Sequence, residues 1–169
     1  MNILTPLPYE HGVYTGTYRS GAFYYSINQG DDGWISKEKW RIGSKASAYM
    51  SSPVLYEGHA YVLIQDGNFA CYNLRTGKEC WRSEKQFGSG RHGKYMSLIR
   101  QGNRILALDQ GGGLHLIKAD PEKFQLIDSK KVSTQPTWSH IAVSDEQVAV
   151  RELNAISLYD WKSPTPIVP

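Results

Sequence analysis

The residues that could do chemistry are few and scattered along the chain. None of the five histidines has a partner at a spacing such as His-x-x-x-His, which two ligands on one helix face would need. These histidines are His11, His59, His92, His115 and His140. No Ser, His and Asp set carries a recognisable nucleophile signature, and Asp66 and Asp109 fall in expected turns, where aspartate is common for local hydrogen-bonding reasons. These residues predict neither a metal site nor a hydrolase site.

A glycine-rich segment resembles a phosphate-binding loop in spacing only. Residues 88–94 read Gly-Ser-Gly-Arg-His-Gly-Lys. Tyr95 follows where such a loop has the Ser or Thr that binds magnesium, and no strand-loop-helix pattern surrounds the segment. We interpret it as a connector between structural repeats.

Two cysteines, Cys71 and Cys80, limit the chain to one disulfide at most. They flank an expected hairpin turn at residues 73–78, which places them on neighbouring strands. Whether they face each other depends on the strand register. A bridge and a pair of half-buried thiols are both compatible with the sequence.

An internal repeat organises the whole sequence. Residues 54–62, 99–106 and 142–150 align, with 44 positions from Gly58 to Gly102 and another 44 to Glu146. A looser copy lies earlier, where Gly12 precedes Gly58 by 46 positions. A period of roughly 40–50 residues is typical of β-propeller blades.

Within each copy, turn residues separate short strand patterns and no helical stripe is sustained, so we expect almost no helix. The predicted fold is all-β, with blades of four antiparallel strands and four blades per chain. One domain would span residues 1–169, with blades at about 5–44, 49–86, 94–133 and 137–162 and a tail at 163–169. The fourth copy lacks an outermost strand, which residues 1–4 could supply in cis or in trans.

One segment points to a family. Residues 70–81, Ala-Cys-Tyr-Asn-Leu-Arg-Thr-Gly-Lys-Glu-Cys-Trp, resemble the repeat of the PQQ-like (quinoprotein) propellers. The resemblance implies that Trp81, and Trp40 in the preceding copy, dock against the neighbouring blade. The other repeat positions to which we give this structural role are Thr76, Gly77 and Trp161. In the third copy, Leu126 and Ile127 stand where the tryptophan is expected.

Quinoprotein dehydrogenases of this family use calcium-bound PQQ, a catalytic aspartate and, in several members, a vicinal cysteine pair. This chain has no Cys-Cys pair. We therefore expect no cofactor and a non-catalytic scaffold. The alternative is part of a quinoprotein-like oxidoreductase whose site is completed by other blades or by a second chain.

A recurring aromatic and hydroxyl pattern precedes the innermost strand of three copies. Innermost strands line the channel of a propeller, so these side chains would meet on its axial face and bind a protein or a small ligand there. Two basic residues would add a cationic rim. The alternative is packing between blades. The candidate residues are Tyr49, Ser51, Arg91, Lys94, Tyr95, Ser97, Trp138 and His140.

Charge and hydropathy narrow the choice of partners. The net charge of +3 forms no basic stripe, so we expect no nucleic acid. No apolar run approaches the roughly 20 residues of a membrane span, and we expect no signal peptide at residues 1–6. The compartment is not predicted, although relatives are often exported.

The blade number leaves the quaternary arrangement open. Propellers of this family usually close with seven or eight blades, whereas four repeats account for this chain. A compact four-blade ring, two half-rings that dimerise into eight blades, and the final part of a longer chain all fit. We expect a homo-oligomer or upstream blades of a longer chain, because an open half-ring would leave adhesive edges.

Overall fold

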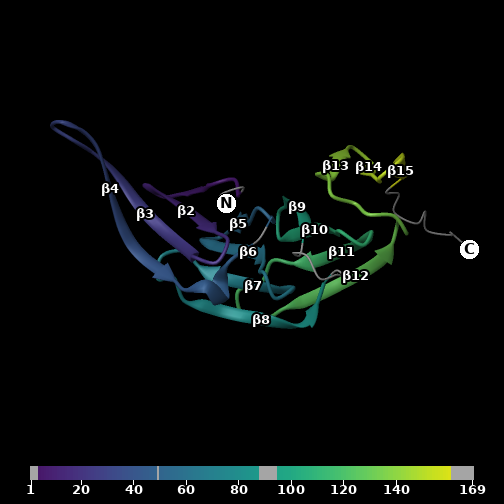
Figure 1. Cartoon of the computed structure of the whole chain (residues 1–169), viewed down its shortest axis with the longest axis horizontal. Coiled ribbons are helices and arrows are strands. Elements are labelled where there is room, and N and C mark those ends of the chain that lie inside the picture. The colour runs from purple at the N-terminus through teal and green to yellow at the C-terminus, as the bar shows by residue number, and fades with distance from the viewer. Residues whose placement is uncertain (1–3, 49, 88–94, 161–169) are drawn as a thin grey trace, which may run out of the picture.

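The structure, a computed structural model, describes residues 4–48, 50–87 and 95–160. Four antiparallel sheets follow one another along an arc, and the β3–β4 hairpin extends beyond the rest at one end (Figure 1). Within the described ranges the single helical element is the 3-10 turn η1, Ser44–Ala46. The predicted all-β propeller fold is confirmed.

Each sheet is a meander whose strands pair in chain order. The first sheet contains β1 (Leu7–Tyr9), β2 (Gly12–Thr17), β3 (Gly21–Gly30) and β4 (Gly33–Ile42). The second contains β5 (Val54–Tyr56), β6 (His59–Leu63), β7 (Asn68–Asn73) and β8 (Glu79–Gln86). The third contains β9 (Met96–Gln101), β10 (Arg104–Asp109), β11 (Gly113–Lys118) and β12 (Gln125–Lys131). The fourth has three strands among the described residues, β13 (Ala142–Ser144), β14 (Gln147–Arg151) and β15 (Ile156–Asp160).

The turn after each innermost strand explains the repeat that the sequence displays. Glu57 and Gly58, between β5 and β6, both have positive φ values, 45° and 72°. Two positive φ values in a row define the type I′ turn, whose twist matches that of the flanking strands. Glu10 and Asp145 adopt the same region at φ 47° and 48° in the first and fourth sheets. The recurring Gly or acidic residue therefore marks one hairpin turn per sheet.

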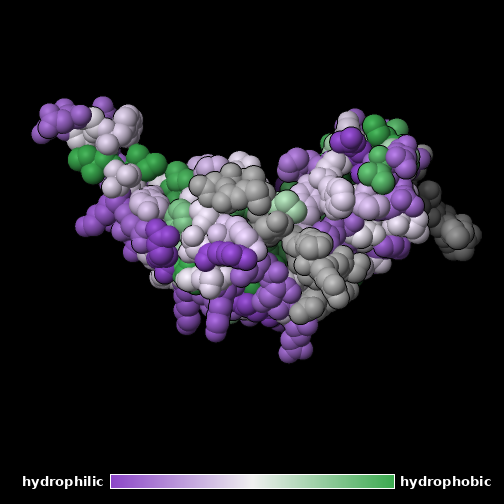
Figure 2. Space-filling model, viewed as in Figure 1, coloured by the Kyte–Doolittle hydropathy of each residue, from purple (hydrophilic) through white to green (hydrophobic). Residues whose placement is uncertain are grey.

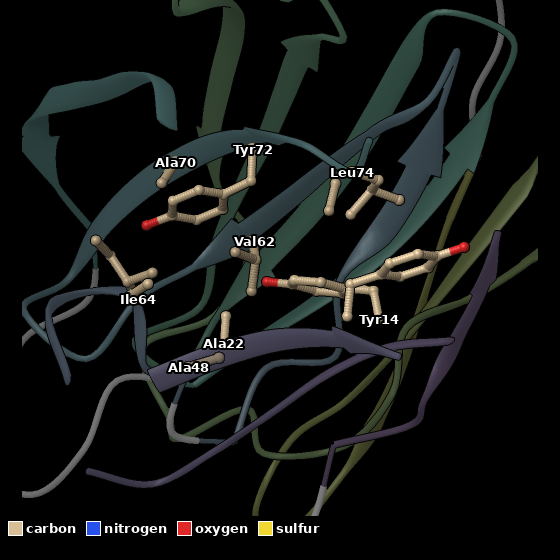
Figure 3. Packing of buried hydrophobic residues seen from close by; sticks show 11 residues of the cluster. Tyr14, Ala22, Ala48, Val62, Ile64, Ala70, Tyr72 and Leu74 are labelled. Carbon is tan, nitrogen blue, oxygen red and sulfur yellow. The ribbon is translucent and has the colours of Figure 1, made fainter. Parts of the chain in front are cut away.

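The two middle sheets are covered on both faces, so their central strands bury side chains on both sides. Along β6, Ala60 and Val62 belong to a cluster shared with the first sheet, whereas Tyr61 and Leu63 belong to a cluster shared with the third. Neighbouring residues of a strand point to opposite faces, which makes this division possible. Figure 3 shows Val62 in the first of these clusters, close to Tyr14 of β2.

Three apolar clusters join consecutive sheets among the described residues, and they differ in size. The clusters between the first and second and between the second and third sheets contain eleven and ten buried residues. The cluster between the third and fourth sheets contains five. None of the three joins the fourth sheet to the first. The third junction is therefore the least completely packed.

A β-bulge recurs in the pairing of the outermost strand with its neighbour. In each of the first three sheets the register shifts by one residue, between Tyr24/Tyr25, Cys71/Tyr72 and Leu116/Ile117. The residues opposite the first member of each pair are Trp40, Trp81 and Asp128.

Asp128 therefore occupies the tryptophan position of the third sheet. The expectation that Leu126 and Ile127 stand at the tryptophan position is wrong, because the sequence repeat does not reveal the extra residue of the bulge. Leu126 pairs with Ile117, and Ile127 is the bulged residue.

The bulge of the second sheet determines whether the two cysteines face each other. Cys71 lies opposite Trp81, and Cys80 is the bulged residue beside it, so the two are not cross-strand partners. Both are free thiols, Cys71 buried and Cys80 half-buried. Burial raises the pKa of the Cys71 thiol well above its ordinary value. Of the two alternatives left by the sequence, the structure has the unbridged one.

Candidate functional site

The junction between the first and second sheets is filled by Trp40. Its indole Nε1 donates a hydrogen bond to the carbonyl of Leu74, 2.9 Å away, in the turn after β7. In this turn Thr76 Oγ1 donates to Asn73 Oδ1 at 3.1 Å. Gly77 has φ 74°, and a Cβ at this position would lie 2.6 Å from Trp40 Cδ2. The turn thus requires glycine both for its backbone conformation and for the indole against it.

The next junction repeats the arrangement with Trp81. Its Nε1 donates to the carbonyl of Asp120 at 2.7 Å, in the turn after β11. Its ring packs against three aromatic rings, with centroid distances of 6.0 Å to Tyr61, 6.2 Å to Phe69 and 5.6 Å to Phe124. In both junctions an outer-strand indole therefore contacts the following sheet.

Within the part of the chain that the structure describes, the third junction holds a cleft where the other two hold an indole. A cavity of about 350 Å³ lies between the third and fourth sheets, beside Asp128 at the tryptophan position. A second cavity of about 280 Å³ shares Leu106 and Leu116 with the first. We call the larger cavity the junction cleft. Its lining includes Leu106, Leu114, Leu116, Asp128, Lys130, Val148, Tyr159 and Asp160.

A hydrogen-bonded set of Asp109, His115 and Ser129 lies on the opposite face of the third sheet, toward the second sheet, where the His115 ring is 4.9 Å from the Phe87 ring. Asp109 Oδ1 accepts from the backbone N–H groups of Gly111 and Gly113, at 2.8 and 3.0 Å. Its Oδ2 lies 2.9 Å from His115 Nε2, and His115 Nδ1 lies 2.8 Å from Ser129 Oγ. The aspartate and histidine side chains are 10% and 6% exposed.

The electrostatics of Asp109 result from opposing effects. Burial alone would raise its pKa, but the hydrogen bonds from His115, Gly113 and Gly111 outweigh burial and lower the pKa of Asp109 below its ordinary value. The ionised Asp109 carboxylate can accept a hydrogen bond from His115 Nε2–H, while His115 Nδ1 faces the Ser129 hydroxyl.

Sequence reasoning missed this set. His115 and Ser129 face each other only through the β11–β12 register, so no sequence spacing could reveal the pair. The Asp109, His115 and Ser129 set joins the end of β10 to the outermost strand, β12. The backbone N–H of Ser129 donates to Asp128 Oδ1 at 2.7 Å, so this N–H does not serve an oxyanion beside the hydroxyl.

The axial residues expected from the sequence lie in different settings. Ser51 Oγ accepts from the backbone N–H of Met96 at 2.8 Å, and Ser97 Oγ accepts from that of Ile141 at 3.0 Å. Both serines are buried, so their hydroxyls link neighbouring sheets.

The aromatic and basic members of the axial set differ in accessibility. Tyr95 is 8% exposed, whereas Trp138 is 64% exposed and His140 is also exposed. Trp138 and Arg151 help line a small cavity of about 160 Å³. Four candidate residues lie outside the described residues: Tyr49, Arg91, Lys94 and Trp161. The glycine-rich segment 88–94 lies outside them too.

Over residues 4–48, 50–87 and 95–160, no group of three or more His, Cys, Asp or Glu side chains is placed to hold a metal ion. A search of the same part of the chain finds no helix of the length and apolar character that crossing a bilayer requires.

Comparison with known proteins places the fold. No protein-family model matches the chain, and no curated protein matches it. Among solved structures, BamB from Moraxella catarrhalis superposes with a TM-score of 0.69 and 14% identity, over 96% of this chain and 45% of that one. The computationally designed Ika4 protein superposes with a TM-score of 0.66 and 11% identity, over 92% of this chain and 88% of that one. The β-propeller domain of Cps50 (Swd1) from Myceliophteria thermophila superposes with a TM-score of 0.64 and 14% identity, over 89% of this chain and 52% of that one.

Two of these three structures are much longer than the match. The chain spans about half the length of BamB and of the Swd1 domain. At such low identity the likeness concerns the fold alone. With the four sheets and their inter-sheet packing, it identifies this chain as a β-propeller.

Proposed function

We propose that this chain is a non-catalytic, PQQ-like β-propeller scaffold that acts by binding. Two copies complete an eight-bladed ring, whose axial face receives a protein partner or a small ligand. The observation that carries the proposal is the state of the outer faces of the first and fourth sheets. Both carry apolar side chains, and within the described residues no sheet covers them, whereas each middle sheet is covered on both sides.

The outer face of the first sheet is aromatic. Val13 pairs with Tyr25 and Thr15 with Phe23, on the side of β2 and β3 opposite the first cluster. Phe23 and Tyr25 meet edge to face with ring centroids 5.7 Å apart, and the Arg41 guanidinium lies 4.5 Å from the Phe23 centroid. These side chains form a ready surface for another sheet.

The outer face of the fourth sheet is aliphatic. Ala149 lies between Ala142 and Leu158 in the register, and Ile156 follows two residues before Leu158 on the same side of β15. Ile156 is 71% exposed and Leu158 is 64% exposed. Figure 2 shows hydrophobic side chains gathered at both ends of the arc.

A second copy is the occupant that covers both faces at once. With a two-fold axis between the copies, the fourth sheet of each packs on the first sheet of the other, and the ring closes. The superposition of nearly the whole chain on less than half of BamB supports this half-ring geometry.

Solution mass tests the proposal. Light scattering over a dilution series is expected to give twice the 19.1 kDa chain mass, about 38 kDa. Leu158→Lys places a charge on the outer face of the fourth sheet and is expected to give the monomer mass. Leu153→Ser is the matched control: Leu153 is 57% exposed in the turn between β14 and β15, and its variant should stay dimeric. A wild-type monomer at all concentrations would overturn the closed pair.

A cofactor assay tests the non-catalytic part. The competing function is a quinoprotein-like oxidoreductase completed by other blades or a second chain. PQQ and Ca²⁺ added to the purified protein should then support reduction of a redox dye with an alcohol or sugar as electron donor. We expect no dye reduction above the rate without protein, and a cofactor-dependent rate would refute the scaffold.

Contact residues on the axial face are proposed from their exposure. Trp138 and His140 are the exposed members of that set, with Tyr95 beneath the surface. In the closed ring each would be present twice, related by the two-fold axis.

A further inference from the structure

We infer that the junction cleft binds a tryptophan side chain presented by a partner protein. This inference specifies the chemistry of one partner contact and places it within a single chain, away from the axial face. It therefore does not depend on whether two copies close a ring.

The repeat itself shows what occupies this place. At the first two junctions, the outer-strand residue opposite Tyr24 or Cys71 is a tryptophan that reaches the next sheet. At the third junction, the equivalent residue opposite Leu116 is Asp128, whose side chain is smaller and charged. The backbone framework, including the bulge, is retained while the indole is missing. Among the described residues, a cavity therefore lies where the other two junctions hold an indole.

The walls of the cleft match an indole in polarity. Leu106, Leu116 and Val148 provide aliphatic surface for the two ring faces. Asp128 in the same lining has carboxylate oxygens that can accept from the single N–H donor of the ring. The two built-in tryptophans satisfy this N–H with a backbone carbonyl of the following sheet.

The acceptors of the two indole N–H groups lie at similar places in their sheets. Trp40 and Trp81 donate to carbonyls just after the third strand of the following sheet, at Leu74 after β7 and at Asp120 after β11. Asp160 is the last residue of β15, the third strand of the fourth sheet, and it lines the cleft. Asp160 pairs with Gln147 as Asn73 pairs with His59, so the equivalents of Leu74 and Asp120 follow Asp160 and lie outside the described residues.

A soluble probe tests the site directly. N-acetyl-L-tryptophanamide is titrated into the full chain, and methyl NMR signals of Leu106, Leu116 and Val148 are followed, with N-acetylglycinamide as the ligand control. We expect saturable shifts at these methyls with a Kd on the order of 1 mM, since a single side chain buries little surface. Shifts that are absent, or confined to other regions, would overturn the inference.

Two variants at one position sharpen the test. Asp128→Trp fills the cleft with the residue found at the other junctions and should weaken probe binding at least tenfold. Asp128→Asn keeps the side-chain size and should leave the Kd within about threefold. Equal binding by wild type and Asp128→Trp would contradict the inference.

A third variant separates a partner's tryptophan from the chain's own. If the probe binds only after Trp161→Ala, the occupant belongs to this chain and the partner proposal is wrong. Repeating the titration with monomeric Leu158→Lys separates the inference from the closed ring. Unchanged cleft shifts there would support the cleft whatever the oligomeric state, whereas their loss would contradict a site contained in one chain.

Discussion

At the scale of single residues, the junction tryptophans stabilise the fold in two ways. The Trp81 ring packs among Tyr61, Phe69 and Phe124, and its N–H donates to Asp120, so it contributes both apolar burial and one hydrogen bond. Removing the ring would leave a cavity between two sheets, and removing only the donor would leave a carbonyl unpaired.

Trp81→Ala is expected to lower the free energy of unfolding by about 3–5 kcal/mol, the usual cost of deleting a large buried aromatic side chain. Trp81→Phe keeps most of the ring and should cost about 1–3 kcal/mol. Urea denaturation measures both. Trp138→Ala, at a 64% exposed position, is the control and should stay within about 0.5 kcal/mol of wild type. Similar losses for Trp81→Ala and Trp138→Ala would contradict the docking role.

The pKa of Asp109 predicts a pH dependence. A carboxyl whose pKa is lower folded than unfolded stabilises the fold above its unfolded value of about 3.9, and this contribution is lost as the pH falls through the folded value. Asp109→Asn should therefore destabilise the protein at pH 7, by about 1–3 kcal/mol. The difference from wild type should shrink between pH 5 and pH 2.5.

Denaturation at several pH values checks this effect, with Asp145→Asn as the control. Asp145 is exposed in a turn at φ 48°, a conformation that asparagine tolerates, so its difference from wild type should be small at each pH. A pH-independent deficit in Asp109→Asn would show that the carboxylate charge is not what the Asp109, His115 and Ser129 chain requires.

At the scale of elements, the turns and bulges set which residues meet between sheets. Gly77 illustrates a turn whose backbone and neighbour both exclude a side chain, with φ 74° and the Trp40 ring in the way. Gly43, which precedes η1, has φ −65° and open space around it. The two glycines form a matched pair.

Gly77→Ala is expected to destabilise the chain by about 1–3 kcal/mol, because alanine is strained at positive φ and would displace the indole. Gly43→Ala should be neutral or slightly stabilising, since it reduces the freedom of the unfolded chain at a compatible position. Thermal unfolding of both variants provides the measurement. A larger loss from Gly43→Ala than from Gly77→Ala would rule out the proposed role of the turn.

The same elements explain what the sequence could predict. The spacing of Gly58 and Gly102 reveals the repeat because both lie in the two-residue turn after an innermost strand, Gly58 as its second residue and Gly102 as its first. The β-bulge has no such signature, so the tryptophan-equivalent residue of the third sheet could not be identified without the register. The contact of His115 with Ser129 depends on the same register, and the burial of Ser51 and Ser97 depends on the neighbouring sheet. Contacts between elements were therefore beyond sequence reasoning.

At the scale of the whole molecule, the proposed pairing of the two outer faces would link stability to association. A pair that closes a ring buries Phe23 and Tyr25 of one copy against Leu158 of the other. The folded pair is then favoured by mass action, because unfolded chains do not associate in this way.

The unfolding midpoint is therefore expected to rise with protein concentration, by a few degrees over a hundredfold range. Differential scanning calorimetry measures the shift. Leu158→Lys should remove the concentration dependence, and Leu153→Ser should retain it. A midpoint that does not change with concentration in wild type would argue against a closed pair.

The direction of the tryptophan contacts also affects local dynamics. Trp40 of the first sheet holds the second, and Trp81 of the second holds the third, but Asp128 gives the third sheet no such hold on the fourth. Amide hydrogen exchange by local opening should therefore be fastest in β13–β15 and slowest in β6, β7 and β10. The chain would open from the C-terminal end of its arc, and any molecule that fills the third junction would suppress the exchange.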